Sequence, residues 1–107
     1  MSFINLSDLA SKELAPGYTA RLVHGNNLTI SHVSVVAGSP LPQHAHPHEQ
    51  VANVIEGEFE MTVGGETRVL RAGAVAVIPP NVPHSGKAIT KCYIVDVFHP
   101  VREDLRK

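Results

Sequence analysis

Histidines that could bind a metal gather in the second quarter of this 107-residue chain, which holds seven histidines in all. His44, His46 and His48 lie in one short segment, and His84 follows after further strand-like runs. Imidazole nitrogen binds divalent transition metals, and the amide oxygen of Gln50 is another competent donor. A site made of histidines and one glutamine would leave coordination positions open to a small molecule.

The spacing of these donors indicates which of them act together. Positions 44, 46 and 50 have equal parity, so along an extended strand their side chains point to one face, whereas Glu49 points to the other. We therefore predict that one divalent transition metal ion is bound by His44, His46, Gln50 and His84. A one-residue bulge would exchange the faces of Glu49 and Gln50, so either remains open as the oxygen donor.

The other histidines are expected outside the ligand set. His48 follows Pro47, which bends an extended strand and spoils its parity, so His48 could support the site or bind substrate instead. An isolated histidine is more often hydrogen-bonded or exposed than a ligand. We expect that state for His24, His32 and His99.

A carboxylate near the C-terminus is the second candidate for chemistry. Asp96 and Phe98 share one face of a strand whose other members on that face, such as Ile94, are apolar. Loss of hydration there would raise the pKa of the Asp96 carboxyl, which suits proton transfer. Arg102 could pair with Asp96 or with a carboxylate of a substrate. The alternative is a structural aspartate that bonds the backbone or faces water.

Short strands must position these residues. Alternating apolar and β-branched residues predict strands at 20–24, 28–36, 51–56, 59–63, 67–71, 74–78 and 91–98. Gly64 and Gly65 separate two of these runs and can adopt positive φ, which predicts a tight hairpin. Only residues 6–14 favour a helix, with Ser7 as its N-cap and Pro16-Gly17 as its stop. The pattern is typical of an all-β sandwich or barrel.

The composition fits one small globular domain covering residues 1–107. Hydrophobic residues make up 43% and charged residues 18%, enough for a core of modest size. A net charge of -1 makes nucleic acid a poor candidate partner. One cysteine excludes an internal disulfide, and no apolar run nears the ~20 residues of a membrane span. We expect a cytoplasmic protein without a membrane partner, and a homodimer, because the core is small and edge strands need covering.

Two motifs around the histidines resemble those of the cupin family. The first, Gly-x5-His-x-His-x3-Glu-x6-Gly, is matched by Gly38, His44, His46, Gln50 in the glutamate place and Gly57. The second, Gly-x5-Pro-x-Gly-x2-His-x3-Asn, is matched by Gly73, Pro79 and His84, with Asn81 in the glycine place and Ala88 in the asparagine place. The resemblance implies a cupin-type double-stranded β-helix, a jelly-roll barrel whose core covers about 18–100, with the metal inside its mouth.

Within the cupins, the chain is similar to the small proteins of pectin and alginate breakdown, which linearise 4,5-unsaturated uronates. That resemblance implies catalytic roles for Asp96, which moves a proton, for Arg102, which orients the substrate carboxylate, and for Phe98, which packs against the sugar. Glutamine in place of glutamate leaves the metal more electropositive, which also favours a carboxylate substrate. The implied protein is a metal-dependent isomerase- or lyase-type enzyme acting on a small sugar acid. Ni, Mn, Fe, Co, Zn and Cu all stay open as its metal.

Two other functions are compatible with the same ligand set. One is an iron-dependent dioxygenase of a small organic substrate, because three histidines and one oxygen donor can hold ferrous iron with open positions. The other is a non-catalytic cupin that binds a sugar or an acid. Consumption of oxygen would distinguish the dioxygenase from an isomerase.

Overall fold

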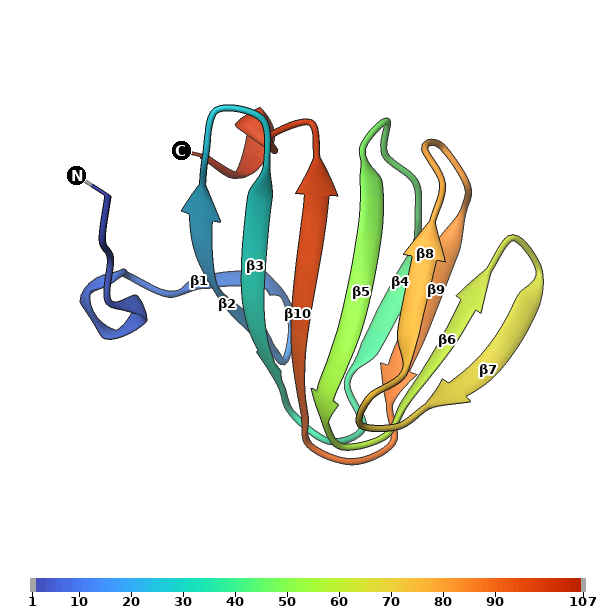
Figure 1. Cartoon of the computed structure of the whole chain (residues 1–107). Helices are drawn as coiled ribbons and strands as arrows, with labels where there is room; N and C mark the ends of the chain where they lie inside the picture. Colours follow the sequence, from blue (N-terminus) through green and yellow to red (C-terminus); the bar gives the residue numbers. More distant parts are fainter. Residues whose placement is uncertain (1, 107) are drawn as a thin grey trace.

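Two antiparallel sheets face each other in the computed structural model, which describes residues 2–106 (Figure 1). The larger sheet has six strands in the order β1-β2-β3-β10-β5-β8, and the smaller has four in the order β4-β9-β6-β7. The strands are β1 (Lys12–Ala15), β2 (Tyr18–His24), β3 (Thr29–Val35), β4 (Pro40–His44), β5 (Glu49–Glu56), β6 (Phe59–Val63), β7 (Glu66–Leu70), β8 (Val75–Ile78), β9 (His84–Ala88) and β10 (Cys92–His99). The predicted all-β jelly-roll architecture is confirmed, although the two sheets do not join into one closed hydrogen-bonded barrel.

The seven predicted strands are all present among the described residues, each displaced by no more than two residues at either end. The predicted hairpin is confirmed as well. Gly64 and Gly65, with φ of 55° and 89°, connect β6 to β7, and Val63 pairs with Glu66 beside the turn. Alternation of side chains and turn chemistry are local signals, which explains why these elements could be predicted.

Two strands that carry site residues were not predicted, β4 and β9. β4 contains two prolines and β9 has a glycine at its centre, and both residue types lower strand propensity. The two strands pair with each other, with Pro40 opposite Lys87 and His44 opposite His84. Since β4 is an edge strand, its prolines are tolerated, and pairing with β9 rather than local propensity makes it a strand.

The predicted helix over residues 6–14 is wrong. A single 3-10 turn, η1, covers Leu6–Asp8, and the following residues form β1, in which Lys12 lies opposite Ala20 of β2. Helix propensities of ordinary residues differ by at most about 0.7 kcal/mol. Pairing with β2 satisfies a whole row of backbone donors and acceptors, so it outweighs that preference. The expected stop at Pro16 and Gly17 is the turn between β1 and β2.

The apolar residues that alternate along the strands meet between the two sheets. Phe59, Ile78, Val35 and Val54 are buried there, and the Phe59 ring meets the Tyr18 ring edge-on with 6.4 Å between centroids. A cavity of about 500 Å³ is hollowed beside this core and is lined from both sheets. No helical segment in residues 2–106 is long and apolar enough to cross a membrane.

We expect Gly57→Ala to destabilise the fold strongly. Gly57 follows β5 with a φ of 87°, and a Cβ at this position would overlap the carbonyl oxygen of Lys91. Gly65→Ala is the matched control, because its φ is 89° but no atom lies within 4 Å of the added Cβ. Urea unfolding should show a loss of about 1–2 kcal/mol for the control, from backbone strain alone, and more than about 3 kcal/mol for Gly57→Ala. Equal losses would contradict the steric explanation.

Candidate metal centre

Three histidines from separate parts of the chain converge on one point, and two of them, His44 and His46, line the cavity. His44 ends β4 and lies opposite His84, the first residue of β9, while His46 lies in the turn that leads to β5. A ligand nitrogen of each ring lies within 4.8 Å of those of the other two, and we call these residues the histidine trio. The sequence predicted His44 and His46 on one face by parity along one strand, with His84 added from a later segment. The structure brings the three together by pairing two strands and adding a turn.

The hydrogen bonds of the trio prepare one nitrogen of each ring for a metal. Each Nδ1 donates to a backbone carbonyl oxygen two residues away: His44 to Pro42 at 2.8 Å, His46 to His48 at 3.0 Å and His84 to Val82 at 2.9 Å. A carbonyl oxygen only accepts, so the proton is on Nδ1 and the lone pair is on Nε2. The Nε2 of His84 is buried and has no hydrogen-bond partner in the described chain. That orphaned acceptor fits a metal ion.

Gln50 extends the donor set in a way that also fits a cation. Its Nε2 donates to Oδ1 of Asp96 at 3.0 Å, which turns its Oε1 toward Nε2 of His46 at 3.1 Å. Both of these facing atoms carry lone pairs, so a positive charge between them is needed to make the arrangement favourable. Glu49 is exposed and Gln50 is buried, so the structure places Gln50 on the cavity side.

His48 and Asn81 support the trio from outside it. The His48 carbonyl accepts the bond from His46 Nδ1, and the His48 ring centroid is 5.7 Å from that of His46. The backbone N–H of Asn81 donates to the carbonyl oxygen of His46 at 2.8 Å. Asn81 has a φ of 65°, a left-handed conformation that asparagine tolerates, which explains how it fills the glycine place of the second motif. The loop before β9 is thereby fastened to the loop before β5.

The other histidines behave as expected and lie outside the trio. Nδ1 of His24 is hydrogen-bonded to the Thr29 hydroxyl at 2.8 Å, and Nδ1 of His32 to the Tyr93 hydroxyl at 3.2 Å. His99 is exposed. Within the trio, burial lowers the pKa of His46 and of His84, and the nearby Arg102 charge lowers both further. The lower pKa of His46 and His84 favours their neutral imidazole form, which is the form that binds a metal.

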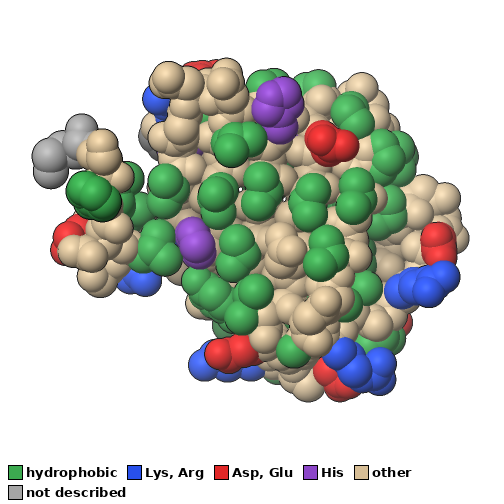
Figure 2. Space-filling model, viewed as in Figure 1, with side chains coloured by type: hydrophobic (Ala, Val, Ile, Leu, Met, Phe, Trp, Pro, Cys, Tyr) green, Lys and Arg blue, Asp and Glu red, His purple; other side chains and the backbone are tan. Residues whose placement is uncertain are grey.

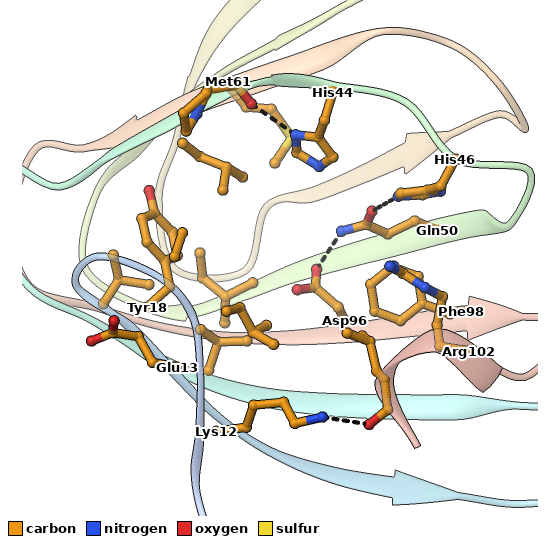
Figure 3. A pocket seen from close by; sticks show the side chains of 18 of the residues that line it. Lys12, Glu13, Tyr18, His44, His46, Gln50, Met61, Asp96, Phe98 and Arg102 are labelled. Atoms are coloured by element: carbon orange, nitrogen blue, oxygen red, sulfur yellow. Dashed lines mark hydrogen bonds between the residues drawn. The ribbon is translucent and has the colours of Figure 1, made fainter. Parts of the chain in front are cut away.

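Asp96 projects from β10 into the same cavity. It is half-buried, and loss of hydration raises the pKa of its carboxyl to about 6, against smaller opposing effects of the Gln50 hydrogen bond and of Arg102. Its carboxylate accepts a hydrogen bond from the Gln50 side chain rather than from the backbone. Asp96 is thus one amide group away from the histidine trio (Figure 3).

Arg102 does not pair with Asp96, which was one of the two partners expected for it. Its guanidinium is paired with Asp104, at 3.0 Å from Nε and 2.8 Å from Nη2. The Cζ atom lies 4.7 Å from the centroid of the Phe98 ring, which in turn lies 5.7 Å from the His46 ring. Arg102, Phe98 and Asp96 all line the cavity. Six of the predicted site residues line one cavity of about 500 Å³: His44, His46, Gln50, Asp96, Phe98 and Arg102. The ring of the seventh, His84, contacts two of them, with centroids 4.2 Å from His44 and 4.9 Å from His46.

Comparison with known proteins is consistent with this geometry. Residues 31–98 match the model of the cupin domain. The chain belongs to the cupin family. The pectin degradation protein KdgF of Dickeya dadantii is 28% identical over 96 residues, which are 87% of each chain. This cupin thus resembles KdgF over most of its length, as the motifs predicted.

Solved structures extend the comparison. The structure of KdgF from a Halomonas species has a TM-score of 0.90 at 28% identity and covers 98% of each chain. An RmlC-like cupin from Shewanella frigidimarina has a TM-score of 0.90 at 30% identity, over 97% of this chain and 95% of that one. Salicylate 1,2-dioxygenase from Pseudoaminobacter salicylatoxidans has a TM-score of 0.76 at 25% identity, and this cupin covers only 28% of that chain.

The cavity contains groups that sequence reasoning did not single out. Lys12 and Glu13 of β1 lie in its wall, as do Tyr18 and Met61 (Figure 3). Tyr18 donates its hydroxyl proton to the Ser39 carbonyl oxygen at 2.9 Å. β1 was expected to be helical, so the sequence carried no signal that would place Lys12 and Glu13 beside the site.

The metal-free protein should report the altered carboxyl of Asp96 through its stability. A folded-state pKa of about 6, above the ordinary 3.8, means that the folded chain holds this proton more tightly than the unfolded chain. Asp96 therefore costs stability increasingly as the pH rises from about 4 to 6, and the cost persists above pH 6. Asp96→Asn should be more stable than wild type by roughly 2–3 kcal/mol at pH 7 and equal to it near pH 3. Urea unfolding at both pH values measures the difference, and a constant difference would contradict the assignment.

Proposed function

We propose that this cupin is a metal-dependent enzyme that converts 4,5-unsaturated uronates into linear keto sugars. One observation carries the proposal: His44 and His46 of the histidine trio line one cavity of about 500 Å³ together with Gln50, Asp96 and Arg102. A metal site, a proton-transfer group and a cation for a carboxylate would thus face one small molecule. Similarity to KdgF over most of the chain supports pectin-derived sugar acids as the substrate class.

In the proposed mechanism, His44, His46, Gln50 and His84 hold one divalent transition metal ion. When bound, the ion supplies a Lewis acid that stabilises negative charge developing on substrate oxygens. The ring opens when the C1 hydroxyl proton leaves and the bond from C1 to the ring oxygen breaks. The resulting enol or enolate becomes a ketone when C4 gains a proton. The sum is an isomerisation that loses no atoms.

The chain's own residues handle the proton and the carboxylate in this proposal. Asp96 moves the proton, because its carboxyl lines the cavity and is held in place by Gln50. Arg102 orients the substrate carboxylate through charge-assisted hydrogen bonds. The Phe98 ring, 5% exposed and beside His46, packs against the sugar.

The test is metal-dependent loss of the alkene signal of a 4,5-unsaturated galacturonate, followed by NMR. The protein is loaded separately with Ni, Mn, Fe, Co, Zn and Cu, and bound metal is verified in each sample. Turnover above the spontaneous rate with at least one ion supports the proposal. The absence of acceleration in every verified metal-loaded sample would contradict it.

An iron-dependent dioxygenase is the second candidate, favoured by the structural likeness to salicylate 1,2-dioxygenase. Oxygen uptake by the Fe-loaded protein in the presence of a small aromatic acid would support this candidate. Turnover of the uronate without oxygen uptake would favour the isomerase.

We also propose that this cupin is a homodimer, with the outer face of the larger sheet as the interface. Apolar side chains spread over this face (Figure 2). The strand register aligns one β-branched residue from each of five neighbouring strands across it: Val23, Ile30, Val97, Val51 and Val77. Burial of such a row against a second copy would remove apolar surface from water.

Val77→Lys should therefore shift the protein from dimer to monomer. Val77 is 61% exposed on this face, so a lysine there should leave the fold intact but oppose burial in an interface. Val36→Lys is the matched control, since Val36 is 63% exposed but follows β3 outside the row. Sedimentation velocity measures the mass of each variant. A monomeric wild type would contradict the proposal, as would a dimer that survives Val77→Lys together with Val97→Lys.

A further inference from the structure

The Arg102 guanidinium is fixed by a neighbouring carboxylate. Asp104, two residues on, accepts hydrogen bonds from both Nε and Nη2, at 3.0 and 2.8 Å, in a bidentate arrangement. Arg102 keeps only 13% of its side chain exposed, whereas Asp104 is 57% exposed. The carboxylate therefore clamps one edge of the guanidinium from the solvent side.

Two further contacts fix the same arginine. The Phe98 ring covers one face of the guanidinium, with Cζ 4.7 Å from the ring centroid. The backbone N–H of Arg102 donates to the hydroxyl of buried Thr29 at 2.8 Å. The segment that follows is tied down as well, because Nζ of Lys12 donates to the Leu105 carbonyl oxygen at 3.0 Å. The backbone N–H of Arg102, one face of its guanidinium and the Nε/Nη2 edge thus all have partners.

One edge of the guanidinium is left over. Nη1 has no hydrogen-bond partner among residues 2–106, and Nη2 uses one of its two protons on Asp104. Nη1 and Nη2 together form the second edge at which arginine binds a carboxylate in bidentate fashion. Since Arg102 lines the cavity beside Asp96 and Phe98, this edge is the one that remains for an anionic ligand.

We propose that Asp104 is a positioning residue, which presents the free Nη1/Nη2 edge of Arg102 to the carboxylate of the substrate. This proposal rests on the proposed function, in which Arg102 receives that carboxylate. Asp104 touches no substrate itself. Its hydrogen bonds to the Nε/Nη2 edge already restrict the rotamers of the long Arg102 side chain in the free protein. Without them, the conformational entropy of that side chain would be lost when the substrate binds, which would weaken binding.

Removal of Asp104 tests the proposal, because its charge and its positioning role predict opposite changes in the affinity for an anionic ligand. Loss of a negative charge beside Arg102 would, by electrostatics alone, strengthen the binding of an anion. Loss of the clamp weakens it. Glu103 supplies the matched control, because it lies one residue away in η2 (Glu103–Leu105), carries the same charge and pairs with Arg106 at 3.0 Å instead of with Arg102.

The test compares binding of galacturonate and of neutral galactose to zinc-loaded protein by NMR titration. Asp104→Ala should raise the Kd for galacturonate on the order of 10-fold and leave that for galactose unchanged. Glu103→Ala should leave both unchanged or bind galacturonate slightly more tightly. Asp104→Glu should recover part of the loss. With Arg102→Met as the background, Asp104→Ala should cause no further loss. Equal or tighter binding of galacturonate by Asp104→Ala would overturn the proposal.

A second measurement separates this proposal from the proposed function. The Nε–H of Arg102 should give a slowly exchanging signal in ¹⁵N-edited spectra of wild type and Glu103→Ala, and lose it in Asp104→Ala. An unchanged signal in Asp104→Ala would overturn the positioning role whatever the substrate is. If galacturonate binds no better than galactose to wild type, the uronate function fails instead, and the Nε–H signal alone decides whether Asp104 positions Arg102.

Discussion

Asp96→Asn should lower the rate of uronate conversion by about 100- to 10,000-fold while the metal stays bound. Asparagine has nearly the same shape, and its Oδ1 can still accept the hydrogen bond that Gln50 Nε2 now donates to Asp96 at 3.0 Å. The orientation of Gln50 toward His46 is therefore kept. What is lost is the group that gives and takes a proton. The NMR assay of alkene loss measures the rate, and elemental analysis measures the bound metal.

Glu49→Gln is the control for this substitution. It also replaces a carboxylate with an amide beside the donor set, but Glu49 is exposed and points away from the cavity. Its rate should stay within about twofold of wild type. An Asp96→Asn variant that retains full activity would remove Asp96 from the mechanism. Loss of the metal together with the activity would mean that Asp96 acts on the metal site through Gln50.

His46→Ala should weaken the binding of a divalent transition metal on the order of 100-fold or more. Structural sites spread roughly 10–16 kcal/mol over four ligands, so one ligand accounts for a few kcal/mol. Nε2 of His46 faces Oε1 of Gln50 at 3.1 Å. No other ring of the trio makes such a contact with Gln50 within residues 2–106, so the substitution separates Gln50 from the trio. Competition with a chromophoric chelator measures the affinity.

His32→Ala is the matched control for metal binding. His32 is also a half-buried histidine with a hydrogen-bonded Nδ1, but it lies on β3 with Tyr93 as its partner, outside the trio. Its loss should leave the metal affinity unchanged. If His46→Ala bound metal as tightly as wild type, the convergence of the three rings would have to be explained without an ion.

Much of this architecture is local and could be read from the chain. Alternation of side chains predicted seven strands, and Gly64-Gly65 predicted the hairpin, because both depend on residues close in sequence. The strands β4 and β9 were missed, since their prolines and glycine argue against strands until each has a partner. The helix over residues 6–14 was predicted wrongly for the related reason that β1 exists only through its pairing with β2.

Residue types and spacing also determined the donors of the candidate site: three histidines, a glutamine, a late aspartate and an arginine, in an order that resembles the cupin motifs. Only the tertiary structure decided how they meet. In the folded chain, His44 of β4 pairs with His84 of β9. The side chain of Gln50, rather than that of Glu49, faces the cavity. Arg102 forms its ion pair with Asp104 instead of Asp96. The sequence determines which side chains are available. The tautomer of a histidine, the orientation of an amide and the choice of ion-pair partner depend on atoms that come within hydrogen-bonding distance only when the chain folds.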